Sequence, residues 1–363
     1  MTEAIPAVLM RGGTSKGVFL HARDIPLAGP QRDALLLGLL GSPDPMQIDG
    51  LGGTTSSTSK VMIVEPGPGP VISYWFGQVG ISDPTVDWSS NCGNLTAAVA
   101  AFAVDEGLVP ATEPLTRVML LNGNTGVRVE AEVHVRAGRA RTTGEQWIAG
   151  VPWPGSPITT NYLDPGGSVT GRLFPTGNPI DTVDVGGGPV DLSIVDVASA
   201  YVFARASSLG VVAGARSVAE LNSDRGLLAG LERLRGEAAR LMGVVDASAD
   251  AASQSPAVPR IVLIAPGTDP AVAELDVVAV SMGAVHRALP GTAAVCLAAA
   301  AQLPGTIPNL CRTSSGDHLV LRHPLGTVDV RAEVRLRPQP RVVSAGVVRT
   351  ARRLMSGLAY PRS

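Results

Sequence analysis

The order of hydrophobic and polar residues along the chain predicts short strands interrupted by a few helices. Runs of β-branched and apolar residues alternate with stretches rich in Gly, Pro and Asn, as is typical of strands joined by turns. In the first half the predicted strands are 4–10, 17–21, 60–64, 71–76, 115–121 and 127–135, and the predicted helices are 30–40 and 95–104. Residues 150–190, rich in Pro, Gly and Thr, predict a long crossover.

The second half repeats this mixture of strands and helices. Its predicted strands are 190–195, 201–204, 261–264, 277–281, 319–322 and 327–336, and its predicted helices are 217–242 and 292–301. The Ala/Ser/Asp-rich stretch 247–256 predicts a surface loop. We expect the tail, 342–358, to add a strand to the first domain.

Short sequence matches between the halves predict a duplicated α+β unit. The helix sequence that follows Thr96 matches the one that follows Thr292, 196 positions later, and the turn at Gly126 matches the turn at Gly326. We therefore predict two similar domains, 1–185 joined by 342–363, and 186–341. Such a duplication is expected to direct two helix N-termini into one cleft, where each can bind a carboxylate.

The composition limits the kinds of partner. A net charge of −2 and an aromatic content of 4% argue against a nucleic-acid-binding surface. Three cysteines without metal-ligand spacing predict free thiols in a reducing compartment and no metal site. We see neither a signal peptide nor an apolar run long enough for a membrane span, and we expect a cytoplasmic protein that does not bind membranes.

The segment Asn91-Cys92-Gly93-Asn94, directly before the first alanine-rich helix, is the strongest candidate for chemistry. We predict Asn94 as the N-cap of this helix. The helix dipole and the free N–H groups favour a thiolate at Cys92 or a bound carboxylate, and Gly93 permits close approach of a ligand. The alternative is a small buried thiol at the start of a helix.

Lysine is scarce in this chain. Only Lys16 and Lys60 are lysines among 29 basic residues, and both follow segments rich in Gly, Ser and Thr. Lysine can lose its proton when partly desolvated whereas arginine cannot, so a retained lysine indicates proton transfer. The alternative is two solvated loop lysines. The 196-residue offset pairs Cys92 with Ala288, so the predicted cleft holds one thiol, and Lys60 becomes the candidate for the second proton carrier.

Several motifs together resemble the PrpF family, which contains 2-methylaconitate cis–trans isomerases and 4-oxalomesaconate tautomerases. The motifs cover nearly the whole chain: Met10-Arg-Gly-Gly-Thr-Ser-Lys-Gly17, Thr58-Ser59-Lys60-Val61, Asn91-Cys-Gly-Asn94, Met282-Gly-Ala-Val-His286-Arg-Ala288, Pro304-Gly-Thr306, His323-Pro-Leu-Gly326 and Arg349-Thr-Ala-Arg-Arg-Leu354. The segment from Asp196 to Tyr201 departs from the family, which usually has an Asn-Pro pair after the Asp. The resemblance implies the α+β diaminopimelate epimerase-like fold, in which each of two pseudo-symmetric domains wraps a curved sheet around a central helix.

The resemblance also implies roles for individual residues. Lys60 and Cys92 match the proton-transfer pair of the family. The remaining predicted site residues bind substrate: Arg11, Gly12, Gly13, Thr14, Ser15, Lys16, Ser59, Asn91, Gly93, Asn94, Met282, His286 and Thr292. Arg287 is a weaker candidate. Cys296 is expected to be a packed core residue.

The expected reaction is a proton shift in an unsaturated di- or tricarboxylate. A base removes a proton beside the double bond, and an acid returns it at the same carbon after bond rotation or two carbons away. We expect Lys60 as the base and Cys92 as the acid, with exchangeable roles, and no cofactor. Small carboxylates are the expected partner, with a homodimer as the candidate assembly. Two alternatives stay open, an amino-acid racemase on the same fold and a non-catalytic carboxylate-binding protein.

Overall fold

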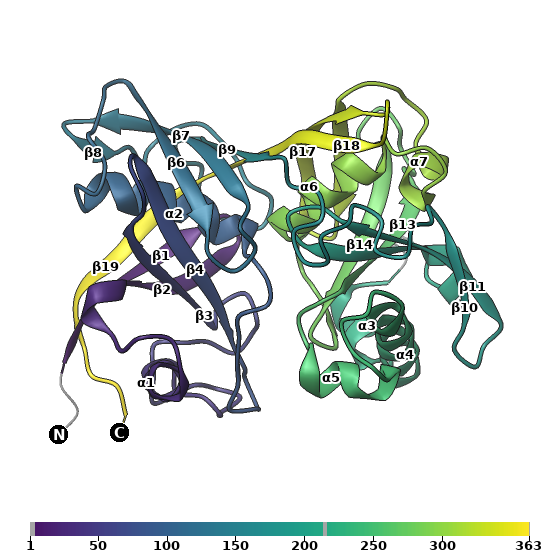
Figure 1. Ribbon diagram of the computed structural model, residues 1–363, viewed down its shortest axis with the longest axis horizontal. Helices are drawn as coiled ribbons and strands as arrows, with labels where there is room; N and C mark the ends of the chain where they lie inside the picture. The colour runs from purple at the N-terminus through teal and green to yellow at the C-terminus, as the bar shows by residue number, and fades with distance from the viewer. Residues whose placement is uncertain (1–3, 213–215, 363) are drawn as a thin grey trace. The chain divides into compact units, whose positions relative to one another are not determined.

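The computed structural model describes residues 4–212 and 216–362. Contacts between Cα atoms divide the chain into two compact units, Met1–Thr160 with Val348–Ser363, and Asn161–Val347 (Figure 1). This division places residues 161–185 with the second unit, whereas the predicted first domain runs to residue 185. No helix of the described residues has the length and apolarity that would let it cross a membrane.

The first unit is built on one mixed sheet with the strand order β19–β1–β2–β3–β4–β6–β7. Strands β2 and β3 are parallel, β4 and β6 are parallel, and the other neighbours are antiparallel. The strands are β1 (Ile5–Gly12), β2 (Ser15–His21), β3 (Lys60–Pro66), β4 (Val71–Val79), β6 (Leu115–Asn122), β7 (Arg128–Arg136) and β19 (Ala351–Ala359), with the short β5 (Val86–Asp87) and β8 (Arg139–Ala140). The prediction that the tail adds a strand to the first unit is confirmed for β19, which pairs with β1. The first part of the predicted tail instead forms β18 (Arg341–Arg349), which pairs with β17 (Gly326–Arg335) of the second unit.

Helix α2 (Gly93–Asp105) is the centre of this unit. It contacts strands β1, β2, β3, β6, β7 and β19, and every residue from Gly93 to Val104 is buried. The alanines explain how one helix can pack against so many strands, because their methyl groups let backbones approach while favouring helix. A smaller cluster beneath the sheet buries α1 (Pro30–Leu40), which begins and ends where predicted.

The second unit repeats this arrangement with its own strands. Its order is β10–β11–β12–β13–β14–β16–β17–β18, and the pairs from β11 to β17 follow the same sequence of antiparallel and parallel neighbours as β1 to β7. The strands are β10 (Asp181–Asp184), β11 (Pro189–Asp196), β12 (Ala200–Arg205), β13 (Arg260–Pro266), β14 (Leu275–Ser281), β15 (Ala284–Val285), β16 (His318–His323), β17 (Gly326–Arg335) and β18 (Arg341–Arg349). The predicted duplication is therefore present in the pairing pattern itself.

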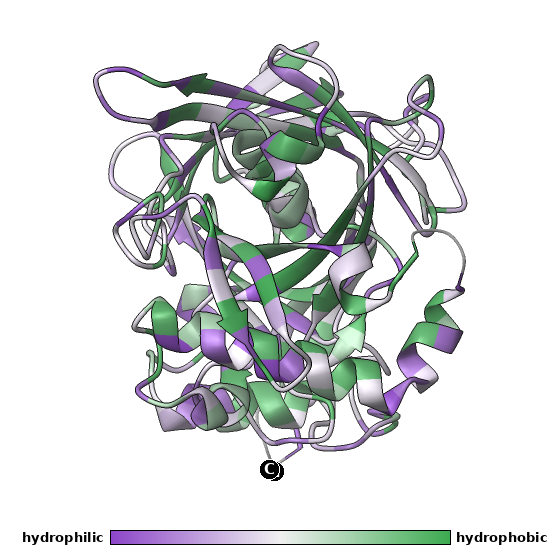
Figure 2. Cartoon of the chain, turned by 90° about the vertical axis from the view of Figure 1, so that its right-hand side faces the viewer, coloured by the Kyte–Doolittle hydropathy of each residue, from purple (hydrophilic) through white to green (hydrophobic). Residues whose placement is uncertain are grey.

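Helix α6 (Gly291–Ala300) takes the place of α2 in this unit. All its residues are buried, and it contacts β11, β12, β16 and β17. Figure 2 shows that hydrophobic residues gather on the inner strands and on the helix that they surround. A second layer packs α3 (Val218–Ser223) and α4 (Arg225–Leu241) against the sheet.

The sequence predictions for residues 150–190, 217–242, 247–256 and 307–311 were incomplete, wrong or missing. The helix predicted over 217–242 is divided, because the Asp224 side chain accepts from the backbone N–H of Leu227 and starts a new helix. The predicted loop 247–256 contains a 3₁₀ turn and α5 (Ala251–Gln254), with Ala251 buried against Ala239. The crossover 150–190 contains β9 (Ile158–Leu163) and β10, and α7 (Ile307–Cys311) was missed.

Candidate active site

Cys92 is the N-cap residue of α2, with its sulfur buried at the start of the helix. The Asn91 Oδ1 atom accepts the backbone N–H of Cys92 at 2.7 Å and the Thr96 hydroxyl at 3.3 Å. Asn94, which was predicted as the cap, is the second residue of the helix. The side chain of the actual N-cap residue, Cys92, makes no capping hydrogen bond. The prediction of Asn94 as the cap was therefore wrong, and the Asn94 side chain makes other hydrogen bonds.

The Asn94 side chain belongs to a hydrogen-bond network at the start of α2. The Asn94 Nδ2 atom lies 3.0 Å from Thr14 Oγ1 and 3.3 Å from Ser15 Oγ, and the Cys92 Sγ atom lies 3.8 Å from the same Ser15 oxygen. The Nε atom of Arg349 donates to Asn94 Oδ1 at 2.9 Å. Sequence reasoning missed Arg349 as a site residue, although it stands in one of the recognised motifs, because it is 255 positions from Asn94.

The loop from Arg11 to Lys16 is held against the same helix start. Arg11 Nη1 donates to the carbonyl of Gly13 and to both oxygens of Thr350, at 2.8–3.1 Å. Burial lowers the Arg11 pKa, and the neighbouring Arg352 lowers it further. A Cβ atom on Gly12 would lie 2.4 Å from the carbonyl oxygen of Asn94, so only glycine permits this approach. The contacts of Arg11 fix the loop.

Lys60 is the first residue of β3, and its side chain is 7% exposed. Its Nζ atom donates to Gln78 Oε1 at 2.5 Å and lies 4.8 Å from the centre of the Phe76 ring. Gln78 is the register partner of Lys60 on β4, so these two side chains leave the sheet on the same face. The preceding residue, Ser59, is also buried, and its hydroxyl accepts from Gln47 Nε2 at 2.8 Å.

This face of the sheet is the one that packs on α2. Tyr74 and Gln78 share a face because strand side chains alternate, and the Tyr74 hydroxyl lies 3.1 Å from Thr96 Oγ1 of α2. Burial raises the pKa of Tyr74 to about 12. A Cβ on Gly17 would lie 3.0 Å from the Lys60 carbonyl oxygen and 2.8 Å from Leu95 Cδ1. Lys60 and Cys92 therefore lie on the same side of the sheet, beside the first turn of α2.

Three predicted residues belong to the second unit. Met282 and Gly283 form the two-residue turn between β14 and β15, both with positive φ (52° and 72°), the pattern of a type I′ turn. The backbone N–H of His286 donates to Ala279, and its ring Nδ1 contacts the backbone of Ala288. The described contacts of these residues are local, and substrate binding by them stays a prediction.

Thr292 lies in the first turn of α6 and is bonded to a buried tyrosine. Its hydroxyl is 2.7 Å from the Tyr201 hydroxyl, which also accepts from Arg260 Nη1 at 3.3 Å. Burial raises the Tyr201 pKa, although Arg260 acts in the opposite direction. Arg260 is itself 6% exposed and is a second site candidate that sequence reasoning missed.

The helix starts show which residue corresponds to Cys92. Cys92 is the N-cap of α2 and Pro290 is the N-cap of α6, so the structural counterpart is Pro290 and not Ala288. Neither Pro290 nor Ala288 carries a thiol, and a single thiol in the predicted cleft stays a prediction. Cys296 is inside α6, where burial raises its pKa well above the usual value, as expected of a core residue.

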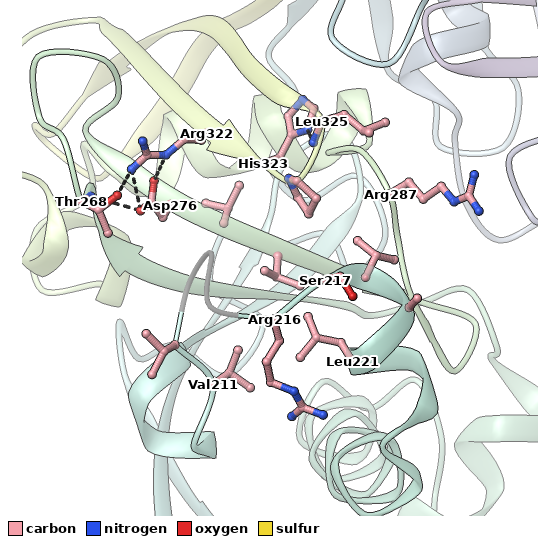
Figure 3. Close-up of a pocket in the computed structure, with 16 residues that line it drawn as sticks. Val211, Arg216, Ser217, Leu221, Thr268, Asp276, Arg287, Arg322, His323 and Leu325 are labelled. Atoms are coloured by element: carbon pink, nitrogen blue, oxygen red, sulfur yellow. Dashed lines mark hydrogen bonds and ion pairs between the residues drawn. The ribbon is translucent and has the colours of Figure 1, made fainter.

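A cavity of about 770 Å³ lies elsewhere, in the second unit (Figure 3). Its wall contains Val277, Val278 and Leu221 among other apolar residues, and the weaker site candidate Arg287 also lines it. Arg322 at its edge is bonded to Asp276 at 2.7 Å. Lys60 and Cys92 are not among the residues that line this cavity, and their part in the chemistry stays a prediction.

Comparisons with known proteins identify the family of the chain. A family model described as "PrpF protein" matches residues 2–362. The chain is 39% identical over 371 residues to the 3-methylitaconate isomerase of Eubacterium barkeri, covering 98% of this chain and 97% of that protein. It is also 39% identical over 382 residues to the 2-methyl-aconitate isomerase of Shewanella oneidensis, covering 97% and 96%.

A solved structure is similar over the same length. The crystal structure of a methylitaconate-delta-isomerase matches with a TM-score of 0.79 and 37% identity, covering 99% of this chain and 96% of that one. The duplicated units, each with a mixed sheet around a buried helix, are the diaminopimelate epimerase-like fold that the motifs led us to expect.

Proposed function

Because this chain belongs to the PrpF family, we propose that it moves a proton within an unsaturated di- or tricarboxylate, by acid–base chemistry of Lys60 and Cys92 and without a cofactor. The chain is an isomerase, the activity named for its relatives. Their names give methylitaconate and 2-methylaconitate as substrates, and we propose an acid of this class for this protein.

The burial of both proposed proton carriers on one face of the sheet is the observation that supports the mechanism. The two side chains able to exchange protons are both buried on the α2 face of the first sheet, although 32 positions separate them in the sequence. Burial excludes water from the transfer, and the two groups arise from different elements, β3 and the N-cap of α2. This arrangement permits removal of a proton by one group and its return by the other.

The reaction requires stabilisation of a dienolate. The C–H bond beside a conjugated carboxylate is a weak acid, so the negative charge must be held by groups that are already in place. The first-turn N–H groups of α2, at Gly93 and Asn94, provide positive partial charge. The Lys16 ammonium stands on the loop that Arg11 fixes, and a carboxylate of the substrate is its proposed partner.

A racemase with two opposed thiols is the less favoured alternative. Pro290 occupies the place where such an enzyme would need its second thiol, and Arg260 occupies the place of Lys60. Arginine does not release its proton near neutral pH. The second unit therefore supplies neither proton carrier at these two positions.

The proposal is tested by incubating the enzyme with methylitaconate, 2-methylaconitate, oxalomesaconate and, for comparison, L-proline in deuterated water. We expect an absorbance change and deuterium uptake with at least one unsaturated acid and none with proline. Lys60→Met and Cys92→Ala should each abolish deuterium uptake. Racemisation of proline, or full turnover by both variants, would overturn the assignment.

A further inference from the structure

The hydrogen bonds from Arg349 through Asn94 to Ser15 run in a single donor direction. Arg349 Nε can only donate, so the atom of Asn94 that faces it must be the carbonyl oxygen Oδ1. The amide nitrogen of Asn94 is then fixed toward Ser15 Oγ, to which it donates at 3.3 Å. Arg349 thereby settles the orientation of the Asn94 amide, which is otherwise ambiguous.

Ser15 connects the Asn94 amide to the sulfur of Cys92. Its hydroxyl oxygen accepts from Asn94 at 3.3 Å and from the Cys92 S–H at 3.8 Å, and once the thiol has lost its proton the Ser15 hydroxyl proton can turn to the sulfur. All four residues are buried: Ser15, Cys92, Asn94 and Arg349. A chain of donors that begins at a guanidinium and ends at sulfur stabilises a negative charge on that sulfur.

The environment of Lys60 has the opposite preference. The Nε2 atom of Gln78 donates to the backbone carbonyls of Ser56 and Ser59, at 3.1 and 2.9 Å, so Oε1 is the atom that faces Lys60. An amide oxygen accepts from an ammonium group, and the Phe76 ring 4.8 Å away attracts a cation. Both neighbours favour the charged form of Lys60.

We propose that the resting enzyme holds a Cys92 thiolate and a Lys60 ammonium, so that Cys92 removes the substrate proton and Lys60 returns one, with Arg349, Asn94 and Ser15 as the relay that stabilises the thiolate. This inference rests on the proposed function and deepens it. It reverses the order that the sequence led us to expect, in which Lys60 is the base.

The step is balanced in atoms and charge. The thiolate forms an S–H bond as the C–H bond breaks, and the electron pair enters the dienolate. The Lys60 ammonium then gives a proton to carbon and becomes a neutral amine. The thiol and the amine return to the starting state by exchanging protons with water. Arg349 acts on the sulfur through Asn94 and Ser15, so it is a positioning residue.

Other titratable groups around the thiol do not compete for this role. The Tyr74 hydroxyl is a neighbour of Cys92, and its pKa of about 12 keeps it neutral in the working range. Arg11, on the loop that carries Ser15, donates hydrogen bonds to Thr350 and Gly13.

The test is the rate at which iodoacetamide alkylates Cys92, followed by peptide mass spectrometry as a function of pH. Wild type should react at pH 7 and show the ultraviolet absorbance of a thiolate that Cys92→Ala lacks. Ser15→Ala and Arg349→Met should react about tenfold more slowly at pH 7 and recover at higher pH. Arg349→Lys, which keeps a donor toward Asn94, should recover part of the rate.

The matched control is Ser193→Ala, which removes a buried serine hydroxyl from the second unit. It should leave the pH dependence of alkylation and the turnover unchanged, and unfolding curves establish that every variant is folded. If Cys92→Ala is inactive but Ser15→Ala and Arg349→Met alkylate like wild type, the relay is refuted while the proposed function survives. If Cys92→Ala turns over normally, the proposed function itself fails.

Discussion

Lys60 and Arg260 are the first residues of β3 and β13, two strands with corresponding places in the two units. Both side chains are buried, at 7% and 6% exposure, and both strands continue with four buried residues. Each strand is parallel to the strand before it and antiparallel to the strand after it. The two copies of one unit thus differ at this position in whether the cation can give up its proton.

The replacement Lys60→Arg tests this difference directly. Arginine already fits the corresponding position of β13, so the variant should fold and keep the positive charge. Because arginine does not release its proton, kcat should fall by a factor of about 10²–10⁴. Steady-state kinetics and deuterium exchange measure the loss, with circular dichroism as the control for folding. An active, folded Lys60→Arg enzyme would show that Lys60 contributes only charge.

The close approach of β1 to α2 predicts a stability effect at Gly12. In Gly12→Ala, the new methyl group would lie 2.4 Å from the Asn94 carbonyl oxygen and 3.0 Å from the Ala98 methyl. The helix start must then shift, which should lower the free energy of unfolding by about 1–3 kcal/mol in urea. The control Gly357→Ala, on β19 with no atom within 4 Å of the new methyl, should change it by less than about 0.5 kcal/mol.

Tyr74 predicts how stability changes in alkali. Its pKa is about 12 in the folded protein and 10.0 as the reference value for the unfolded chain, so the unfolded chain loses this proton first. Its contribution is complete below pH 10 and declines as the pH rises from 10 toward 12, by about 1.4 kcal/mol for each unit.

Urea unfolding at pH 9 and pH 11 measures this decline. Tyr74→Phe should lose about 1.4 kcal/mol less than wild type over the interval, because one ionising group is gone. Part of the decline should persist in this variant, since burial also raises the Tyr201 pKa. Equal declines in wild type and variant would contradict the assignment to Tyr74.

Asp196, at the end of β11, organises the loop that precedes this strand. Its buried carboxylate accepts from Ser168 Oγ, from the backbone N–H groups of Val169 and Thr170, and from Thr170 Oγ1, at 2.7–3.0 Å. In Asp196→Asn, one of these oxygens becomes a donor that faces other donors. We expect a loss of about 1–3 kcal/mol in the free energy of unfolding. The control is Asp191→Asn on the exposed side of the same strand, with an effect within about 0.5 kcal/mol.

Most of the fold could be predicted because its signals are local. The turn at Asn122 to Gly126 and the alanine runs around Thr96 and Thr292 mark their elements in a few residues. The break at Asp224 was missed because a continuous helical pattern runs through it, and only the cap decides where α4 begins. The helix at Ile307–Cys311 was missed because five residues give no periodicity.

The site could be predicted only in part, for a related reason. The scarcity of lysine and the position of Cys92 before a helix are visible in the sequence, and they name the two proton carriers. The partner of Asn94 is not visible, because Arg349 reaches it only after β18 and β19 are in place. Pairing by sequence offset gave Ala288 as the counterpart of Cys92, whereas the helix starts give Pro290, because α2 begins three residues before Thr96 and α6 begins one residue before Thr292.

The return of the C-terminal segment to the first unit has a consequence for biosynthesis. Strand β19 pairs with β1, and Arg349 immediately precedes it. During translation, α2 and the thiol emerge from the ribosome some 250 residues before Arg349. A nascent chain, or one truncated by premature termination, therefore carries Cys92 without the guanidinium that orders its surroundings. The surroundings of Cys92 are therefore completed only after Arg349 has been synthesised.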